Sequence, residues 1–175
     1  MGSEMCIRDR AFIAEAVFRT VPISKLTTTT VAVFDDLTAA TKSLPALLDT
    51  GAATLELMDS ASIRVGQGFD KVPQAITGFD VDQQAALLIE YHADAQEELQ
   101  EKESKGSQLL RELPLQSPAA FSADAATRTT AWNFRKGLYA QVAEARPSGT
   151  TALLEDIVVP VGDLADTCSS LQELF

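Results

Sequence analysis

The order of strand-like and helix-like segments is the feature that most restricts how this chain folds. Residues 27–34 are rich in β-branched side chains and residues 84–91 form a mostly apolar run, so both predict strands. Residues 53–58 predict a short strand between them. The helical spacing of apolar residues from Leu37 to Leu48 predicts a helix that joins the first two of these strands.

The C-terminal half continues the alternation of helices and strands. In chain order it predicts a long acidic helix over residues 95–113, an extended stretch over 115–121, a helix over 123–145, a strand over 150–161 and a helix after Asp163. Single helices between strands, each apolar on one side, favour an α+β fold. We expect a ferredoxin-like antiparallel sheet with helices packed mainly on one face. The alternative is a doubly wound sheet, which is weakened because no glycine-rich loop follows a strand.

The charge of the chain excludes several classes of partner. Its 175 residues suggest one domain and carry 14 Lys and Arg against 25 Asp and Glu, a formal net charge of −11. This acidity disfavours binding to nucleic acid and to anionic lipid. No segment approaches the roughly 18 apolar residues of a membrane span. We therefore expect no nucleic-acid partner and no transmembrane segment. As a separate expectation, the protein is cytoplasmic, either free or associated with the inner face of the membrane.

Few residues carry a catalytic or metal-binding pattern. Cys6 and Cys168 are far apart and form no metal or disulfide framework. His92 is the only histidine, and its place directly after a strand favours a structural role over a catalytic one. Motifs of the serine-hydrolase, zinc-protease, dinucleotide and P-loop types are absent from the sequence. We expect no metal site and no catalytic residue in this chain.

Both ends of the sequence suggest a piece of a longer protein. Residues 1–10 show no apolar period and resemble a translated sequencing-adaptor remnant, so we expect a non-native tail; a disordered native N-terminus is the alternative. Residues 11–23 alternate apolar and polar side chains and predict a strand. The last predicted helix reaches Phe175 without a capping Gly or Asn, so we expect a truncated C-terminus.

Two charged clusters are candidates for a binding site. Arg135 and Lys136 follow Trp132 in an otherwise apolar helix, and the planar donors of an arginine match a substrate carboxylate. Glu155 and Asp156 are consecutive on a predicted strand, so one of them faces the interior and needs a partner. These carboxylates either form a wall of the site or pair with Arg135 as internal scaffolding.

Two segments and one pair of segments together resemble a known family. Residues 11–22 look like the last strand of a FAD-binding domain, and residues 53–59 look like an A-x-E-L-M-D strand. Residues 132–137 and 155–160 look like a W-x-x-R-K and E-D-V-x-V-P pair. Over residues 11–175 the chain resembles the C-terminal domain of FAD-linked oxidases of the D-lactate and glycolate dehydrogenase type.

The resemblance implies an activity and roles for particular residues. The implied reaction is the oxidation of a 2-hydroxy acid by hydride transfer to FAD. Arg135 matches the arginine that grips the substrate carboxylate, with Lys136 and Trp132 beside it as substrate-binding residues. The segment that holds Glu155, Asp156 and Pro160 matches a strand near the flavin edge, so these three are the implied cofactor-binding residues.

The resemblance also implies a domain organisation. Residues 11–23 would end the FAD-binding domain, and residues 24–175 would form the C-terminal substrate domain, truncated at its end. FAD would be held by a preceding domain of the same polypeptide, and a 4Fe-4S cluster by a domain further downstream. We expect the fragment alone to be inactive. The alternative is a stand-alone ferredoxin-like module that binds a ligand or regulates without catalysis.

Overall fold

A small antiparallel sheet forms the centre of the protein. The computed structural model describes residues 14–145, 147–150 and 158–174. Its strands are β1 (Leu26–Phe34), β2 (Thr54–Met58) and β3 (Ala85–Ala93), in the order β1-β3-β2. β3 is antiparallel to both neighbours, so β1 and β2 run parallel to each other on either side of it.

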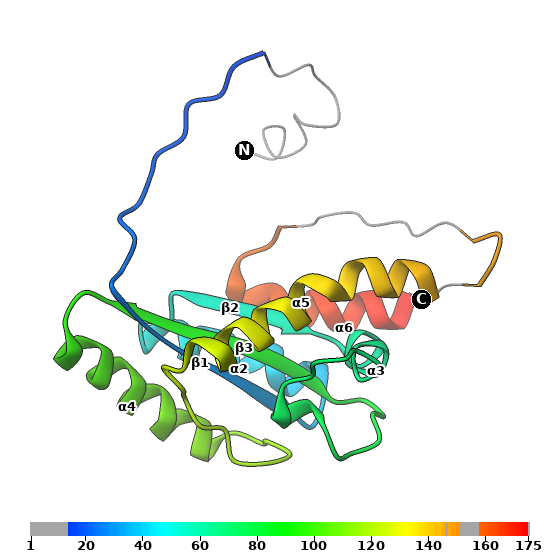
Figure 1. Cartoon of the computed structure of the whole chain (residues 1–175). Coiled ribbons are helices and arrows are strands. Elements are labelled where there is room, and N and C mark those ends of the chain that lie inside the picture. The colour runs from blue at the N-terminus through cyan, green and yellow to red at the C-terminus, as the bar shows by residue number, and fades with distance from the viewer. Residues whose placement is uncertain (1–13, 146, 151–157, 175) are drawn as a thin grey trace.

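Helices surround this sheet, as Figure 1 shows. In chain order they are α2 (Leu37–Asp49), α3 (Ser60–Gly66), α4 (Gln96–Glu112), α5 (Ala125–Ala145) and α6 (Leu164–Leu174), with short 3₁₀ turns η1 (Gln74–Ile76) and η2 (Val161–Asp163). The prediction of an α+β fold with a ferredoxin-like antiparallel sheet is confirmed, but helices pack on both faces of the sheet rather than mainly on one. Among the described residues, no helix is long and apolar enough to cross a membrane.

Alternating side chains of the strands divide the core into two layers. Leu87 and Ile89 of β3 are buried on the side of α2 and α4. Ala86 and Leu88 are buried on the opposite side, against α3 and α5. This division follows from the period of two residues along a strand. α6 packs against α2 and so adds to the first layer.

The stretch after α4 completes the ferredoxin-like order. Leu115 forms an antiparallel bridge with Phe34, and Ser122 forms one with Thr29, both along the outer edge of β1. Apart from α3 and η1, which lie between β2 and β3, the chain therefore runs strand, helix, strand, strand, helix and extended edge, which is the ferredoxin-like succession. The stretch predicted to be extended over residues 115–121 lies at this edge.

Capping residues explain where two of the helices begin. The Asp36 side chain accepts a hydrogen bond from the Ala39 amide at 2.6 Å, at the start of α2. The Asp59 side chain accepts one from the Ser62 amide at 2.9 Å, at the start of α3. Both satisfy an amide that the first turn of a helix leaves without a backbone acceptor.

One predicted strand is wrong, and a second lies mostly outside the described residues. Residues 14–23 form no strand, although residues 11–23 were expected to, and the large apolar side chains among them are exposed: Val17, Phe18, Val21 and Ile23. The reason is that a strand requires a neighbour, and none of the described strands lies beside this segment (Figure 1). Of the strand predicted over 150–161, residues 151–157 lie outside the described residues, residues 158–160 are not in a strand, and Val161 begins η2.

Candidate functional site

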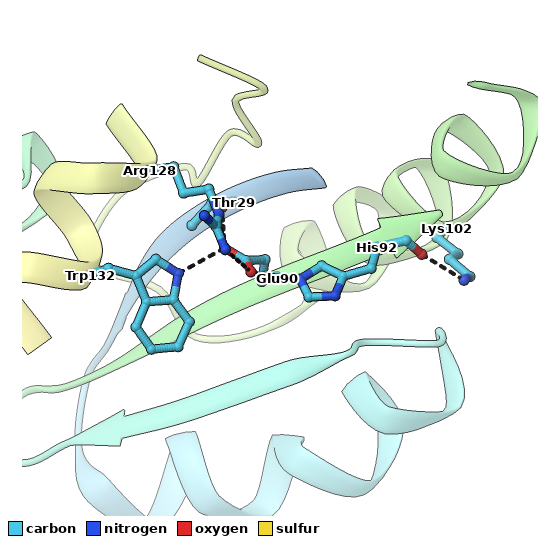
Figure 2. Close-up of polar contacts among 6 residues, drawn as sticks. All are labelled: Thr29, Glu90, His92, Lys102, Arg128 and Trp132. Atoms are coloured by element: carbon cyan, nitrogen blue, oxygen red, sulfur yellow. Dashed lines mark hydrogen bonds and ion pairs between the residues drawn. The ribbon is translucent and has the colours of Figure 1, made fainter. Parts of the chain in front are cut away.

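A buried carboxylate lies at the centre of the polar contacts between β3 and α5 (Figure 2). Glu90 stands near the end of β3, and its side chain is 1% exposed. It accepts hydrogen bonds from Thr29 Oγ1 at 2.7 Å, Trp132 Nε1 at 2.8 Å and Arg128 Nε and Nη2 at 2.8 and 2.9 Å. His92 Nε2 lies 2.6 Å from Glu90 Oε1, the oxygen that also accepts from Arg128 Nη2.

Local geometry brings these partners together from three elements. Glu90 and His92 are two residues apart on β3, so their side chains lie on the same face of the sheet. Thr29 is the residue opposite Glu90 in the register of β1 and β3. Arg128 and Trp132 are four residues apart on α5, so they lie one above the other on the helix face that meets the strand.

These bonds keep Glu90 ionised despite its burial. Burial by itself raises the pKa of this carboxyl. The hydrogen bonds from Arg128, His92, Trp132 and Thr29 together lower the pKa by more than burial raises it, to about 2. The bond to Glu90 in turn raises the pKa of the Arg128 guanidinium. At neutral pH the cluster therefore contains a paired negative and positive charge.

Arg135, the predicted carboxylate-binding residue, makes an ion pair with β2. Its Nη2 lies 3.0 Å from Glu56 Oε2, and both side chains are about one-third exposed (34% and 33%). Its Nε has no hydrogen-bond partner among the described residues. The scaffolding partners considered from the sequence, Glu155 and Asp156, lie outside the described residues. The ion pair links residues 53–59 and 132–137, two of the segments on which the family resemblance rests.

Trp132 and Lys136 lie together at a surface pocket on α5. The Lys136 Nζ is 5.6 Å from the centroid of the Trp132 ring. We call this cavity, of about 320 Å³, the α5 pocket; its lining residues are Arg128, Thr129, Trp132, Asn133 and Lys136. Two of the three predicted substrate-binding residues therefore share one pocket, while Arg135 points to β2 instead.

A larger cavity lies at the outer edge of β1. It has a volume of about 700 Å³ and extends from Thr29–Val31 to the first turns of α5. Among its described lining residues there is no cation, and Asp124 contributes a carboxylate. This cavity therefore lacks the positive charge that an anionic substrate requires.

Pro160 and His92 lie outside the α5 pocket. Pro160 is exposed and directly precedes η2. His92 is 34% exposed and contacts Glu90, while its carbonyl oxygen accepts a hydrogen bond from Lys102 Nζ at 2.9 Å (Figure 2). No group of three or more His, Cys, Asp and Glu side chains could hold a metal ion in the part of the chain that the structure describes.

Sequence reasoning missed Glu90 and Arg128. The signal for Glu90 was available, because a carboxylate that directly follows the apolar run 85–89 must be buried with a cationic or hydrogen-bonding partner. No comparable signal identified Arg128, which is one of several polar residues in the first turns of α5. Its importance follows from the register between α5 and β3, which only the folded chain establishes.

Comparisons with known proteins identify the family. The model of the family described as FAD linked oxidases, C-terminal domain, matches residues 23–175. A comparison with curated proteins gives no match. The family match covers most of the chain and includes β1 to β3, the Glu90 cluster and the α5 pocket. The chain therefore belongs to the FAD-linked oxidases, a family of flavin-dependent oxidoreductases, and carries their C-terminal domain.

Proposed function

We propose that this domain forms the substrate side of a flavin-dependent dehydrogenase that oxidises a 2-hydroxy acid of the D-lactate or glycolate type. The observation that carries the proposal is the concentration of Arg128, Arg135 and Lys136 around Trp132 on α5. The chain as a whole has a net charge of −11, so this local excess of cations is a specific feature. Such a surface suits a small acid rather than a neutral substrate.

Arg135 is the proposed ligand of the substrate carboxylate. Glu56 holds one of its terminal nitrogens at 3.0 Å, which fixes the direction of the guanidinium. The other terminal nitrogen remains to donate to an acid, and its planar geometry suits a carboxylate better than an ammonium group does. Lys136 and Trp132 would contact the same substrate from the α5 pocket.

The proposed protein holds FAD through a domain that precedes this one in the same polypeptide. The described residues contain no glycine-rich loop between a strand and a helix, the pyrophosphate site of doubly wound folds, so they do not fit FAD in that way. When bound, FAD supplies the acceptor for the hydride. The exposed apolar side chains of residues 14–23 support the proposal, because they suit packing against another domain.

A second set of residues is proposed to contact the flavin. Glu155, Asp156 and Pro160 are the proposed contacts to the cofactor edge, and the first two lie outside the described residues. The 4Fe-4S cluster concerns sequence beyond residue 175 and likewise stays a prediction. Neither is needed for the assignment of Arg135.

Kinetics of an arginine variant test the proposal. In the flavin-loaded protein that joins this domain to its FAD-binding domain, Arg135→Lys keeps the charge but removes the planar donors. We expect kcat/KM for the 2-hydroxy acid to fall by about 10²-fold, equivalent to about 3 kcal/mol. Arg111→Lys, at the end of α4, is the matched control and should leave kcat/KM unchanged. Unchanged kinetics with lowered stability would show that Arg135 is only scaffolding.

A stand-alone binding or regulatory module is the second candidate. The two core layers on the faces of the sheet favour it, since they suit independent folding. Joining the FAD-binding domain to residues 11–175 separates the two functions, because the isolated residues lack flavin in either case. Solubility and thermal stability that the joined domain leaves unchanged favour the module, whereas a gain in solubility or stability favours the dehydrogenase.

A further inference from the structure

Arg128 has donors left over after it has paired with Glu90. A guanidinium carries five N–H groups, and Glu90 accepts from one on Nε and one on Nη2. The Arg128 side chain is 45% exposed and lines the α5 pocket. Among the described residues its ion-pair partner is Glu90 alone. The side of the guanidinium that faces the pocket can therefore bind an anion.

The charge at the α5 pocket is positive. Glu90 contributes one negative charge, and Arg128 and Lys136 contribute one positive charge each, which leaves a net charge of +1 when His92 is neutral. None of the ion pairs between described residues involves Lys136. Its ammonium group is thus held by the Trp132 ring and by no described carboxylate.

Trp132 gives the pocket a fixed apolar surface between these cations. Its indole N–H donates to Glu90 at 2.8 Å, which restricts the orientation of the ring. Lys136 and Arg128 lie one helical turn to either side of it on α5. Carbon atoms of a ligand can pack on the ring while its carboxylate meets the cations.

We propose that the α5 pocket binds a small organic carboxylate through Arg128 and Lys136, and that Glu90 is the positioning residue of this site. The pocket volume of about 320 Å³ suits a ligand of this size. Glu90 directs Arg128 and Trp132 by bonding to both, and it does not touch the ligand itself. The choice of a carboxylate as the ligand rests on the proposed function, whereas the site itself rests on the geometry of the pocket.

Charge-selective quenching of fluorescence tests the site in the 175-residue chain without flavin. Trp132 is the only tryptophan, so its emission reports on this pocket alone. The measured quantity is the ratio of the iodide quenching constant to the acrylamide quenching constant. A net charge of +1 about 6 Å from the ring, at an ionic strength of about 0.15 M, should make this ratio about twofold larger for the protein than for N-acetyltryptophanamide. Caesium should quench correspondingly less. Equal ratios for the protein and the free compound would overturn the proposal.

Competition with a carboxylate tests the ligand class. Sodium D-lactate should reduce iodide quenching of the wild-type chain more than sodium chloride does at the same ionic strength. Lys136→Gln, which leaves all the described bonds of Glu90 in place, should abolish this additional protection. Lys105→Gln removes an equal charge from α4 and should retain it. D-lactate that protects no better than chloride, or protection that survives in Lys136→Gln, would overturn the proposal.

Two further variants test the role of Glu90. Arg128→Lys keeps the charge and should preserve the preference for iodide, but it should lose the protection by D-lactate. Glu90→Gln should raise acrylamide quenching, because the ring is less restrained, and should also lose the protection. A folded Glu90→Gln chain with lowered stability but full protection by D-lactate would show that Glu90 is merely structural.

The outcomes separate this proposal from the proposed function. If D-lactate protects Trp132 but the flavin-loaded protein oxidises no 2-hydroxy acid, the pocket stands and the proposed function fails. If the loaded protein oxidises such an acid while Trp132 shows neither charge preference nor protection, the pocket is refuted, and the proposed oxidation stands with Arg135 as the carboxylate ligand but without a role for the α5 pocket.

Discussion

Replacing Glu90 by glutamine should change how stability depends on pH. In the native chain Glu90 is 1% exposed and accepts hydrogen bonds from Arg128, Trp132 and Thr29. Glutamine keeps the shape of the side chain but carries no charge, so Arg128 loses its ion-pair partner. Removing one member of a buried ion pair costs about 3–5 kcal/mol, and the half-exposed Arg128 places Glu90→Gln at the lower end of that range.

The magnitude also follows from the pKa of Glu90. Folding lowers this pKa from 4.5 to about 2, and each pKa unit corresponds to about 1.4 kcal/mol, so the folded state favours the ionised form by about 3 kcal/mol. Since the folded-state pKa is the lower one, this contribution is complete above about pH 4.5 and disappears as the pH falls towards about 2.

Urea titrations followed by Trp132 emission measure the effect. The free energy of unfolding of the wild-type chain should decline by about 3 kcal/mol more than that of Glu90→Gln between about pH 5 and pH 2. Glu101→Gln is the control, because Glu101 is an exposed carboxylate whose pKa Lys105 lowers, and its pH dependence should follow the wild type closely. Parallel curves for the wild type and Glu90→Gln would refute the assignment of Glu90 as a paired buried charge.

Two other substitutions test the packing and the capping of helices. Gly66→Ala should lower the free energy of unfolding by about 1–3 kcal/mol in urea titrations. A Cβ at this position would lie 2.6 Å from Phe134 Cε2 and 2.8 Å from Leu138 Cδ2. This overlap outweighs the better helix propensity of alanine. Gly162→Ala has open space around it and should be neutral; equal losses would contradict the packing argument. Asp36→Ala should cost about 1 kcal/mol by the same assay, because the Ala39 amide loses its acceptor. Asp36→Asn keeps an acceptor, so an equal loss in both variants would contradict the capping argument.

The fold was largely predictable because local patterns determine it. The β-branched residues of β1, the apolar run of β3, the helical period of α2 and the capping residues are all short-range signals. The prediction of a strand over residues 11–23 was wrong, because alternating apolar and polar side chains indicate only that a segment can bury one face. Whether it does so depends on a partner strand, and the described part of the chain offers none there.

The candidate site was predictable only in part. Trp132, Arg135 and Lys136 were singled out as candidates because cations and an aromatic residue stand out in a helix. Their actual partners could not be derived, since the pairing of Arg135 with Glu56 and of Trp132 with Glu90 depends on how α5 crosses the sheet. Such long-range register has no counterpart in the periodicity of the sequence.

Anaerobic reduction of the flavin tests the central claim most directly. The protein that joins this domain to its FAD-binding domain is loaded with FAD and mixed with D-lactate or glycolate, and the visible absorbance of the flavin is followed. We predict that one of these acids bleaches the flavin and that Arg135→Lys slows this bleaching by about 10²-fold at subsaturating acid. A flavin that stays oxidised with both acids, or that bleaches at the same rate in Arg135→Lys, would contradict the claim that α5 binds a 2-hydroxy acid for oxidation.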